Sequence, residues 1–175
     1  MINDASSSRK FSENYFSYLK ILIDELSIEN ISKFIELILQ TRENDKTIYF
    51  IGNGGSASTA SHFVNDISLG SSQFEKPFRA ISLCDNQAVI TAIGNDDGYE
   101  NIFLQQLQTQ AKSGDVLVSI SASGNSPNII KAVNWANSNN IQTVGLSAFD
   151  GGKLSKLVNL NIHAVSYTHL TLPTS

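Results

Sequence analysis

Residues 47–56 read Thr-Ile-Tyr-Phe-Ile-Gly-Asn-Gly-Gly-Ser, a short run that stops abruptly at a glycine-rich turn. Residues 47–51 are apolar, β-branched or aromatic, which is typical of a strand buried on both faces of a sheet. A helical stretch from Ser58 to Leu69 follows the turn. Together these segments predict one strand, turn and helix of an α/β fold.

The same pattern recurs along the chain. We expect further strands at residues 79–83, 115–120, 142–146 and 157–162, and further helices at 101–112 and 127–137. Apolar residues at helical spacing also predict two helices within residues 11–43, with a break near residues 27–30. Strands that alternate with helices predict a parallel sheet covered on both faces. Ligands bind such sheets at the carboxyl ends of the strands.

Length, charge and cysteine content limit the possible functions. The 175 residues are the size of one domain, and no repeat or linker divides them. The net charge is −4 and the 12 Lys and Arg residues are scattered, which argues against a nucleic-acid partner. No apolar run is long enough to cross a membrane. Cys84 is the only cysteine, so we expect no intrachain disulfide and a cytoplasmic location.

The last residues, 165–175, do not continue the pattern. They read Val-Ser-Tyr-Thr-His-Leu-Thr-Leu-Pro-Thr-Ser and resemble translated sequencing-adapter or vector sequence. We therefore treat residues 1–164 as one domain with an N-terminal helical segment, and residues 165–175 as a non-native tail.

Residues 121–126, Ser-Ala-Ser-Gly-Asn-Ser, follow a predicted strand and precede Pro127, which suits the first turn of a helix. The N–H groups and dipole of a helix N-terminus favour an anion, and serine hydroxyls add donors without bulk. A phosphate site is one interpretation. The alternative is that Ser126 only caps the helix and the other serines fill a turn.

The loop at residues 52–56, Gly-Asn-Gly-Gly-Ser, has the same position between a strand and a helix. Its glycines permit positive φ angles and close approach of the backbone to a ligand. It matches neither G-x-G-x-x-G nor a P-loop, because no Lys-Ser/Thr follows the glycines, so a nucleotide is disfavoured. A glycine-rich turn without a ligand is the alternative.

His62 and Asp66 are four residues apart on the predicted helix that follows this loop, so both project from one face. Such a pair can hold part of a Zn²⁺ site or share a proton. An ordinary surface pair is the alternative. The Asn/Asp/Gly-rich residues 95–99 predict a turn, although their side chains could also bind sugar hydroxyls. Cys84 and His163 are interpreted as structural.

Several motifs together resemble the sugar isomerase (SIS) domain family, and most narrowly its sedoheptulose 7-phosphate isomerase (phosphoheptose isomerase) members. The resemblance covers about residues 11–164 and is carried by residues 52–56, Ser61-His62-Phe63, Gly94-Asn95-Asp96, residues 121–126 and Asp150-Gly151-Gly152-Lys153. It implies a flavodoxin-like α/β/α sandwich with a five-stranded parallel sheet. It also implies a homotetramer with sites at subunit interfaces, and one Zn²⁺ per site.

The resemblance further implies aldose–ketose isomerisation of a heptose 7-phosphate, for nucleotide-activated heptose and surface polysaccharide. Ser121, Ser123 and Ser126 would bind phosphate, with the backbone of Ala122. The residues in contact with the sugar phosphate would be Asn53, Gly54, Gly55, Ser56, Asn95 and Asp96. His62 would bind the metal, and Asp66 would stand where the family has a metal-binding, catalytic glutamate.

Two departures from the family bear on activity. Asp66 is one methylene shorter than Glu, and the adapter-like tail stands in place of a last helix that supplies a further metal ligand and a proton-transfer His. No role is carried onto His169, which lies in that tail. We expect the parent protein to be an isomerase and this chain to be weak or inactive. The alternatives are a non-catalytic SIS protein that binds a partner such as the bacterial replication initiator, and a sugar-phosphate-sensing regulator.

Overall fold

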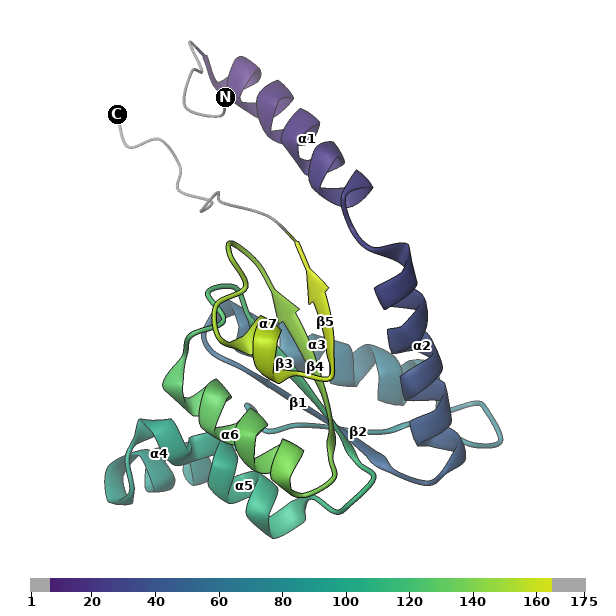
Figure 1. Cartoon of the computed structure of the whole chain (residues 1–175), viewed down its shortest axis with the longest axis vertical. Helices are drawn as coiled ribbons and strands as arrows, with labels where there is room; N and C mark the ends of the chain where they lie inside the picture. The colour runs from purple at the N-terminus through teal and green to yellow at the C-terminus, as the bar shows by residue number, and fades with distance from the viewer. Residues whose placement is uncertain (1–6, 165–175) are drawn as a thin grey trace.

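A computed structural model describes residues 7–164, and its centre is a five-stranded sheet (Figure 1). The strands are β1 (Thr47–Gly52), β2 (Arg79–Ser82), β3 (Val116–Ser121), β4 (Gln142–Ser147) and β5 (Leu160–His163). Their order is β2-β1-β3-β4-β5, and every neighbouring pair is parallel. The predicted parallel sheet is confirmed, and its order is the flavodoxin-like one.

Helices cover both faces of the sheet, and the interior strand β1 buries side chains on both. Ile48 and Phe50 pack into one apolar cluster with α2 (Ile28–Glu43) and α3 (Gly55–Gly70). Tyr49 and Ile51 pack into the other cluster. The helices on that second face are α4 (Gln87–Asp96), α5 (Ile102–Gln110), α6 (Pro127–Ser138) and α7 (Leu154–Leu157). The three-layer sandwich is therefore confirmed.

The first helix, α1 (Ser8–Asp24), extends away from the sandwich (Figure 1). It has no buried residue, and Phe16 and Ile23 are 68% and 60% exposed. The two predicted helices are confirmed, but the break between them lies at residues 25–27, and residues 28–30 already belong to α2. Ser27 caps α2 by accepting a hydrogen bond from the Asn30 N–H.

Helix α4 is the main feature that was not predicted from the sequence. Asn86 caps it by accepting from the Val89 N–H, and its apolar side chains, Ile90 and Ile93, pack against the α5–α6 side of the core. Asn95 and Asp96 are its last residues, so the turn predicted for residues 95–99 is wrong at these two positions. Only Asp97 and Gly98 separate α4 from a short 3₁₀ helix, η1 (Tyr99–Asn101).

The last strand also differs from its prediction at residues 157–162. Leu157 ends α7, and the ladder to β4 begins at Leu160. The intervening Asn159 bonds to Thr143 through its side chain, since its Oδ1 accepts from the Thr143 N–H at 2.8 Å. This bond takes the place of a ladder bond and delays the start of the strand.

Helices that could cross a membrane are not found within residues 7–164. The adapter-like segment 165–175, with His169, lies outside the described residues.

Candidate functional site

The two predicted loops lie at the carboxyl ends of two neighbouring strands. β1 and β3 are paired in parallel, and the chain leaves β1 for α3 on one face and β3 for α6 on the other. This is the point at which the direction of winding reverses, and it is the usual ligand position in open α/β sheets.

A cavity of ≈240 Å³ lies between the loops. It is lined by residues from both predicted loops, together with one strand residue and one aromatic side chain: Asn53, Ser56, Ile120, Ser121, Ala122, Ser123, Ser126 and Phe149. The structure therefore brings six of the predicted substrate-binding residues into one wall. Gly54 and Gly55 adjoin it as the N-cap and first residue of α3.

Gly124 allows the second loop to close tightly on a neighbouring loop. Its φ is +61°, and a Cβ at this position would lie 2.0 Å from the carbonyl oxygen of Gly151. The Gly124 carbonyl oxygen accepts from the Leu154 N–H at 2.9 Å. The loop is thus fixed against residues 151–154, which the sequence linked to the site only through the family resemblance.

Ser126 lies at the N-cap position of α6, but its side chain makes no capping hydrogen bond. The interpretation that Ser126 only caps the helix is therefore wrong. Ser121 does serve the turn, because its Oγ accepts from the Gly124 N–H at 3.2 Å. Ser126 therefore lines the cavity without a capping role.

The charges around the cavity favour an anion. None of its eight lining residues carries a carboxylate. The 16-residue helix α3 and the 12-residue helix α6 both begin at its rim, and the first N–H groups of a helix have no partner within the helix. Serine hydroxyls and helix N-termini are the donors that phosphate groups use in α/β proteins.

A second cavity of ≈520 Å³ lies beside the first and shares Asn53 and Ser126 with it. Its other lining residues are Tyr99, Glu100, Pro127, Asn128 and Lys131. From the sequence, Tyr99 was a candidate only as part of residues 95–99, whose side chains could bind sugar hydroxyls. No role was predicted for Asn128 or Lys131, nor for Phe149 in the first cavity. The signal available for Asn128 and Lys131 was their place on the first turns of α6, directly after the predicted loop.

His62 and Asp66 pair on α3, with His62 Nε2 3.3 Å from Asp66 Oδ2, so the predicted shared face is confirmed. Their side chains are 76% and 60% exposed, and neither lines the two cavities. An imidazole and a carboxylate are suitable Zn²⁺ ligands. Residues 7–164 contain no cluster of three or more His, Cys, Asp or Glu side chains placed to hold a metal.

Asn95 and Asp96 lie at the end of α4, where Asn95 Nδ2 donates to Asp96 Oδ1 at 2.7 Å. Both are exposed, and neither is in the wall of the two cavities. Within one chain the structure does not bring them to the predicted phosphate loops.

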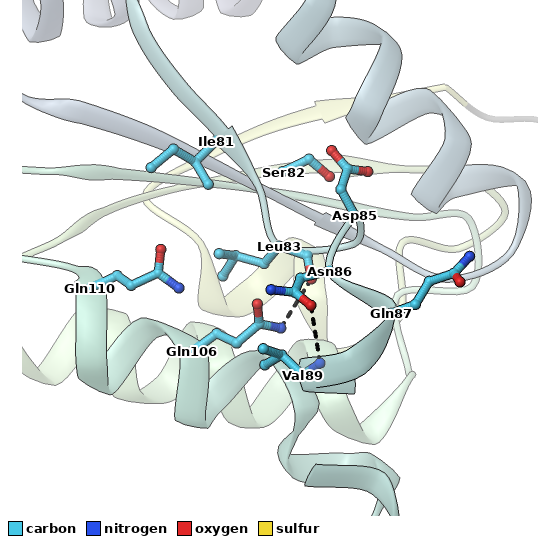
Figure 2. Close-up of a pocket in the computed structure, with 9 residues that line it drawn as sticks. All are labelled: Ile81, Ser82, Leu83, Asp85, Asn86, Gln87, Val89, Gln106 and Gln110. Atoms are coloured by element: carbon cyan, nitrogen blue, oxygen red, sulfur yellow. Dashed lines mark hydrogen bonds between the residues drawn. The ribbon is translucent and has the colours of Figure 1, made fainter. Parts of the chain in front are cut away.

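A third cavity of ≈580 Å³ lies at the carboxyl end of β2 (Figure 2). Its polar lining is mostly amide, and Gln106 Nε2 donates to the Leu83 carbonyl while Asn86 Oδ1 caps α4. Asp85 contributes a negative charge and no cation lines the cavity. This chemistry does not favour a phosphate.

Cys84 and His163 have structural contacts, as predicted. Cys84 Sγ donates to the Gly52 carbonyl at 3.4 Å, under the first loop, and the thiol packs against both apolar clusters. His163 Nδ1 lies 3.0 Å from Ser147 Oγ on the neighbouring strand. Burial raises the pKa of the Cys84 thiol above its usual value.

We expect the Cys84 thiol to be alkylated slowly by iodoacetamide at neutral pH. The reactive species is the thiolate, and a raised pKa means that it forms only at higher pH. The rate followed against pH should have its midpoint above that of a small reference thiol. A midpoint at or below the reference would contradict the structural interpretation of Cys84.

Three comparisons place this chain among known proteins. A family model described as "SIS domain" matches residues 11–148. The chain is 39% identical over 132 residues to a phosphoheptose isomerase of Helicobacter hepaticus. The aligned region covers 75% of this chain and 67% of that protein. The chain is 38% identical over 168 residues to phosphoheptose isomerase 2 of Campylobacter jejuni, covering 88% and 83%. The solved phosphoheptose isomerase of Neisseria gonorrhoeae superimposes with a TM-score of 0.79 at 31% identity, covering 90% and 87%.

Proposed function

The chain belongs to the SIS domain family, and on that basis we propose that it is a phosphoheptose isomerase, which interconverts sedoheptulose 7-phosphate and a heptose 7-phosphate. The observation that carries the proposal is the cavity formed jointly by residues 52–56 and 121–126, whose donors suit a phosphate monoester. Its relatives of known name are isomerases of this substrate class, at 39% and 38% identity. The product would supply nucleotide-activated heptose for surface polysaccharide.

The phosphate end of the substrate would be held by Ser121, Ser123 and Ser126, with the Ala122 backbone and the N-terminus of α6. Asn53 and Ser56 face the same cavity and would hold the adjoining sugar carbons. Gly54, Gly55, Asn95 and Asp96 are proposed to contact the rest of the sugar. These interactions bind and orient the substrate, which places its carbonyl end away from the phosphate loop.

Isomerisation moves a proton between two adjacent carbons through an enediol. Asp66 is proposed as the base that takes the proton from one carbon and returns it to the other, with His62 holding the Asp66 carboxylate in place at 3.3 Å. His62 and Asp66 would also hold one Zn²⁺, with further ligands from outside residues 7–164 of one subunit. The ion would polarise the carbonyl oxygen that gains negative charge.

A homotetramer with its sites between subunits is part of the proposal. Two features support it: the His62–Asp66 pair is open to solvent in one chain, and the apolar side chains of α1 are uncovered. A partner subunit could cover both. A cytoplasmic location is proposed because the single cysteine is unpaired and because the named relatives act on a sugar phosphate.

The direct test is turnover of sedoheptulose 7-phosphate by the purified chain, with aldose formation followed after removal of metal and again after addition of Zn²⁺. If the chain is an active isomerase, product formation falls on chelation and returns with Zn²⁺ but not with Mg²⁺. That outcome would contradict the expectation from the sequence that this chain is weak or inactive. Fructose 6-phosphate serves as the control for a shorter sugar.

The contrary result would be a folded chain that binds sedoheptulose 7-phosphate and never converts it, with or without Zn²⁺. That result would favour a non-catalytic SIS protein, either a partner-binding one or a sugar-phosphate sensor, over an isomerase.

A further inference from the structure

Asn53 and Ser126 line both cavities, and the side chain of Asn53 is held by two residues far away in the sequence. Asn53 Nδ2 donates to Asn128 Oδ1 at 3.0 Å, and Asn128 Nδ2 donates back to Asn53 Oδ1 at 2.8 Å. Tyr99 donates its hydroxyl hydrogen to the same Asn53 Oδ1 at 3.0 Å. Asn128 belongs to none of the motifs that predict the site, and Tyr99 was a candidate only as the last residue of the segment 95–99.

The orientation of both amides follows from one backbone group. The Ile129 N–H, on the first turn of α6, can only donate, and it lies 3.0 Å from Asn128 Oδ1. The other terminal atom of Asn128 is therefore its nitrogen, which requires an acceptor, so the Asn53 atom opposite it is Oδ1. Asn128 is only 2% exposed, so water has little access to the Asn128 side of these bonds.

This arrangement leaves the Asn53 side chain with one hydrogen-bonding group that has no partner among the described residues, a single N–H. An amide oxygen has two acceptor positions, and both positions on Asn53 Oδ1 are taken, by Asn128 and by Tyr99. One of the two Nδ2 hydrogens is given to Asn128. The second has no acceptor among the described residues, and Asn53 lines both cavities.

We propose that Asn128 and Tyr99 are positioning residues that fix Asn53 as a one-sided hydrogen-bond donor toward an oxygen of the bound sugar phosphate. The inference rests on the proposed function for the identity of the ligand. An Asn side chain without these partners could rotate its amide and present either a donor or an acceptor to the ligand. Its N–H would then not be held in one direction. The pinned Asn53 offers only N–H, which suits a carbonyl or hydroxyl oxygen of the sugar.

The test uses Asn128→Asp, which keeps the shape of the side chain and the acceptor for the Ile129 N–H. It replaces the donor that faces Asn53 Oδ1 with an oxygen, so Asn53 loses its fixed orientation. A carboxylate near a helix N-terminus is tolerated, so the fold is expected to remain intact. The matched control is Asn134→Asp, the same change at an exposed position on α6, outside both cavities.

Binding is measured by calorimetry with two probes, sedoheptulose 7-phosphate and inorganic phosphate. We expect Asn128→Asp to weaken the sugar phosphate about 10-fold and Tyr99→Phe to weaken it about 3-fold, from the loss of one oriented hydrogen bond or part of it. Affinity for inorganic phosphate, which lacks the sugar oxygens, should not change in Tyr99→Phe. In Asn128→Asp it should fall less than sugar-phosphate affinity does, because the new carboxylate repels both ligands alike. Asn134→Asp should change neither.

A double-mutant cycle separates positioning from general damage. In an Asn53→Ala background, Asn128→Asp should have a much smaller effect on sugar-phosphate affinity than in the wild-type chain, because its main effect acts through Asn53. An effect of undiminished size in that background, or wild-type affinity in Asn128→Asp alone, would overturn the inference.

The orientation of the Asn53 amide can also be tested without a ligand, and therefore independently of the proposed function. In the ¹⁵N-labelled wild-type chain, one side-chain N–H of Asn53 should exchange slowly with solvent and the other quickly. Equal, fast exchange of both would overturn the reciprocal amide pair. Failure of the chain to isomerise sedoheptulose 7-phosphate would overturn the proposed function and leave the exchange and affinity results interpretable.

Discussion

Asp66→Asn is expected to lower kcat for sedoheptulose 7-phosphate by a factor of about 100 or more, with a smaller change in KM. The substitution keeps the size of the side chain but removes the negative charge that a base and a metal ligand both require. A positioned general base contributes about 10²–10⁴ to a rate, and a neutral amide cannot take a proton at neutral pH. The rate should be measured with saturating Zn²⁺, so that loss of a ligand and loss of a base are not confused.

The controls for this prediction exploit the position of the pair on the surface of α3. The side chains of His62 and Asp66 are largely exposed, so removing their contact should leave the unfolding midpoint unchanged. Asp66→Glu provides the longer carboxylate and should retain activity. Glu75→Gln removes an exposed carboxylate between α3 and β2 and should have no effect. A wild-type rate in Asp66→Asn would remove Asp66 from the mechanism.

Local patterns were sufficient to predict the sheet and the position of both loops. Residues 47–51 form a buried strand because β-branched and aromatic side chains pack well on both faces, and this preference is visible in the sequence itself. The loops were predictable because parallel strands place their carboxyl ends at one edge. Cavity formation by residues 52–56 and 121–126 follows from these two rules.

The elements that the sequence did not reveal depend on contacts between distant residues. α4 is rich in β-branched residues, and it is helical because Ile90 and Ile93 find a place in the core that includes α5 and α6. β5 starts late because Asn159 bonds to Thr143, 16 residues away. The bonds from Asn53 to Tyr99 and Asn128 span 46 and 75 residues, and no spacing rule connects such positions.

The proposed metal ligands, His62 and Asp66, show a different limit of prediction from sequence. Spacing on a helix placed His62 and Asp66 on one face, and the structure confirms this at 3.3 Å. The same spacing could not distinguish a zinc site from a surface pair. That distinction depends on which groups approach the pair from outside, and within residues 7–164 of one chain no further ligand set does so.

Gly124→Ala is expected to destabilise the protein by roughly 3 kcal/mol and to abolish measurable binding of inorganic phosphate. The position has a φ of +61°, and a non-glycine residue held in such a conformation costs about 1–3 kcal/mol. In addition, the new Cβ would lie 2.0 Å from the Gly151 carbonyl oxygen, so loop 121–126 must move away from residues 151–154. Movement of the loop would disturb the arrangement of Ser121, Ser123 and Ser126, which are proposed to hold the phosphate.

Gly94→Ala is the matched control, because it makes the same chemical change and has the same effect on the entropy of the unfolded chain. Gly94 lies within α4, and a Cβ added there would meet no neighbouring side chain or loop within 4 Å. The substitution is therefore expected to stabilise the protein by about 0.5–1 kcal/mol. Urea unfolding of the two variants should move the midpoint in opposite directions at an unchanged m-value. Equal stability of the two variants would mean that loop 121–126 is free to relax. The proposal that residues 151–154 hold this loop rigidly for phosphate binding would then be wrong.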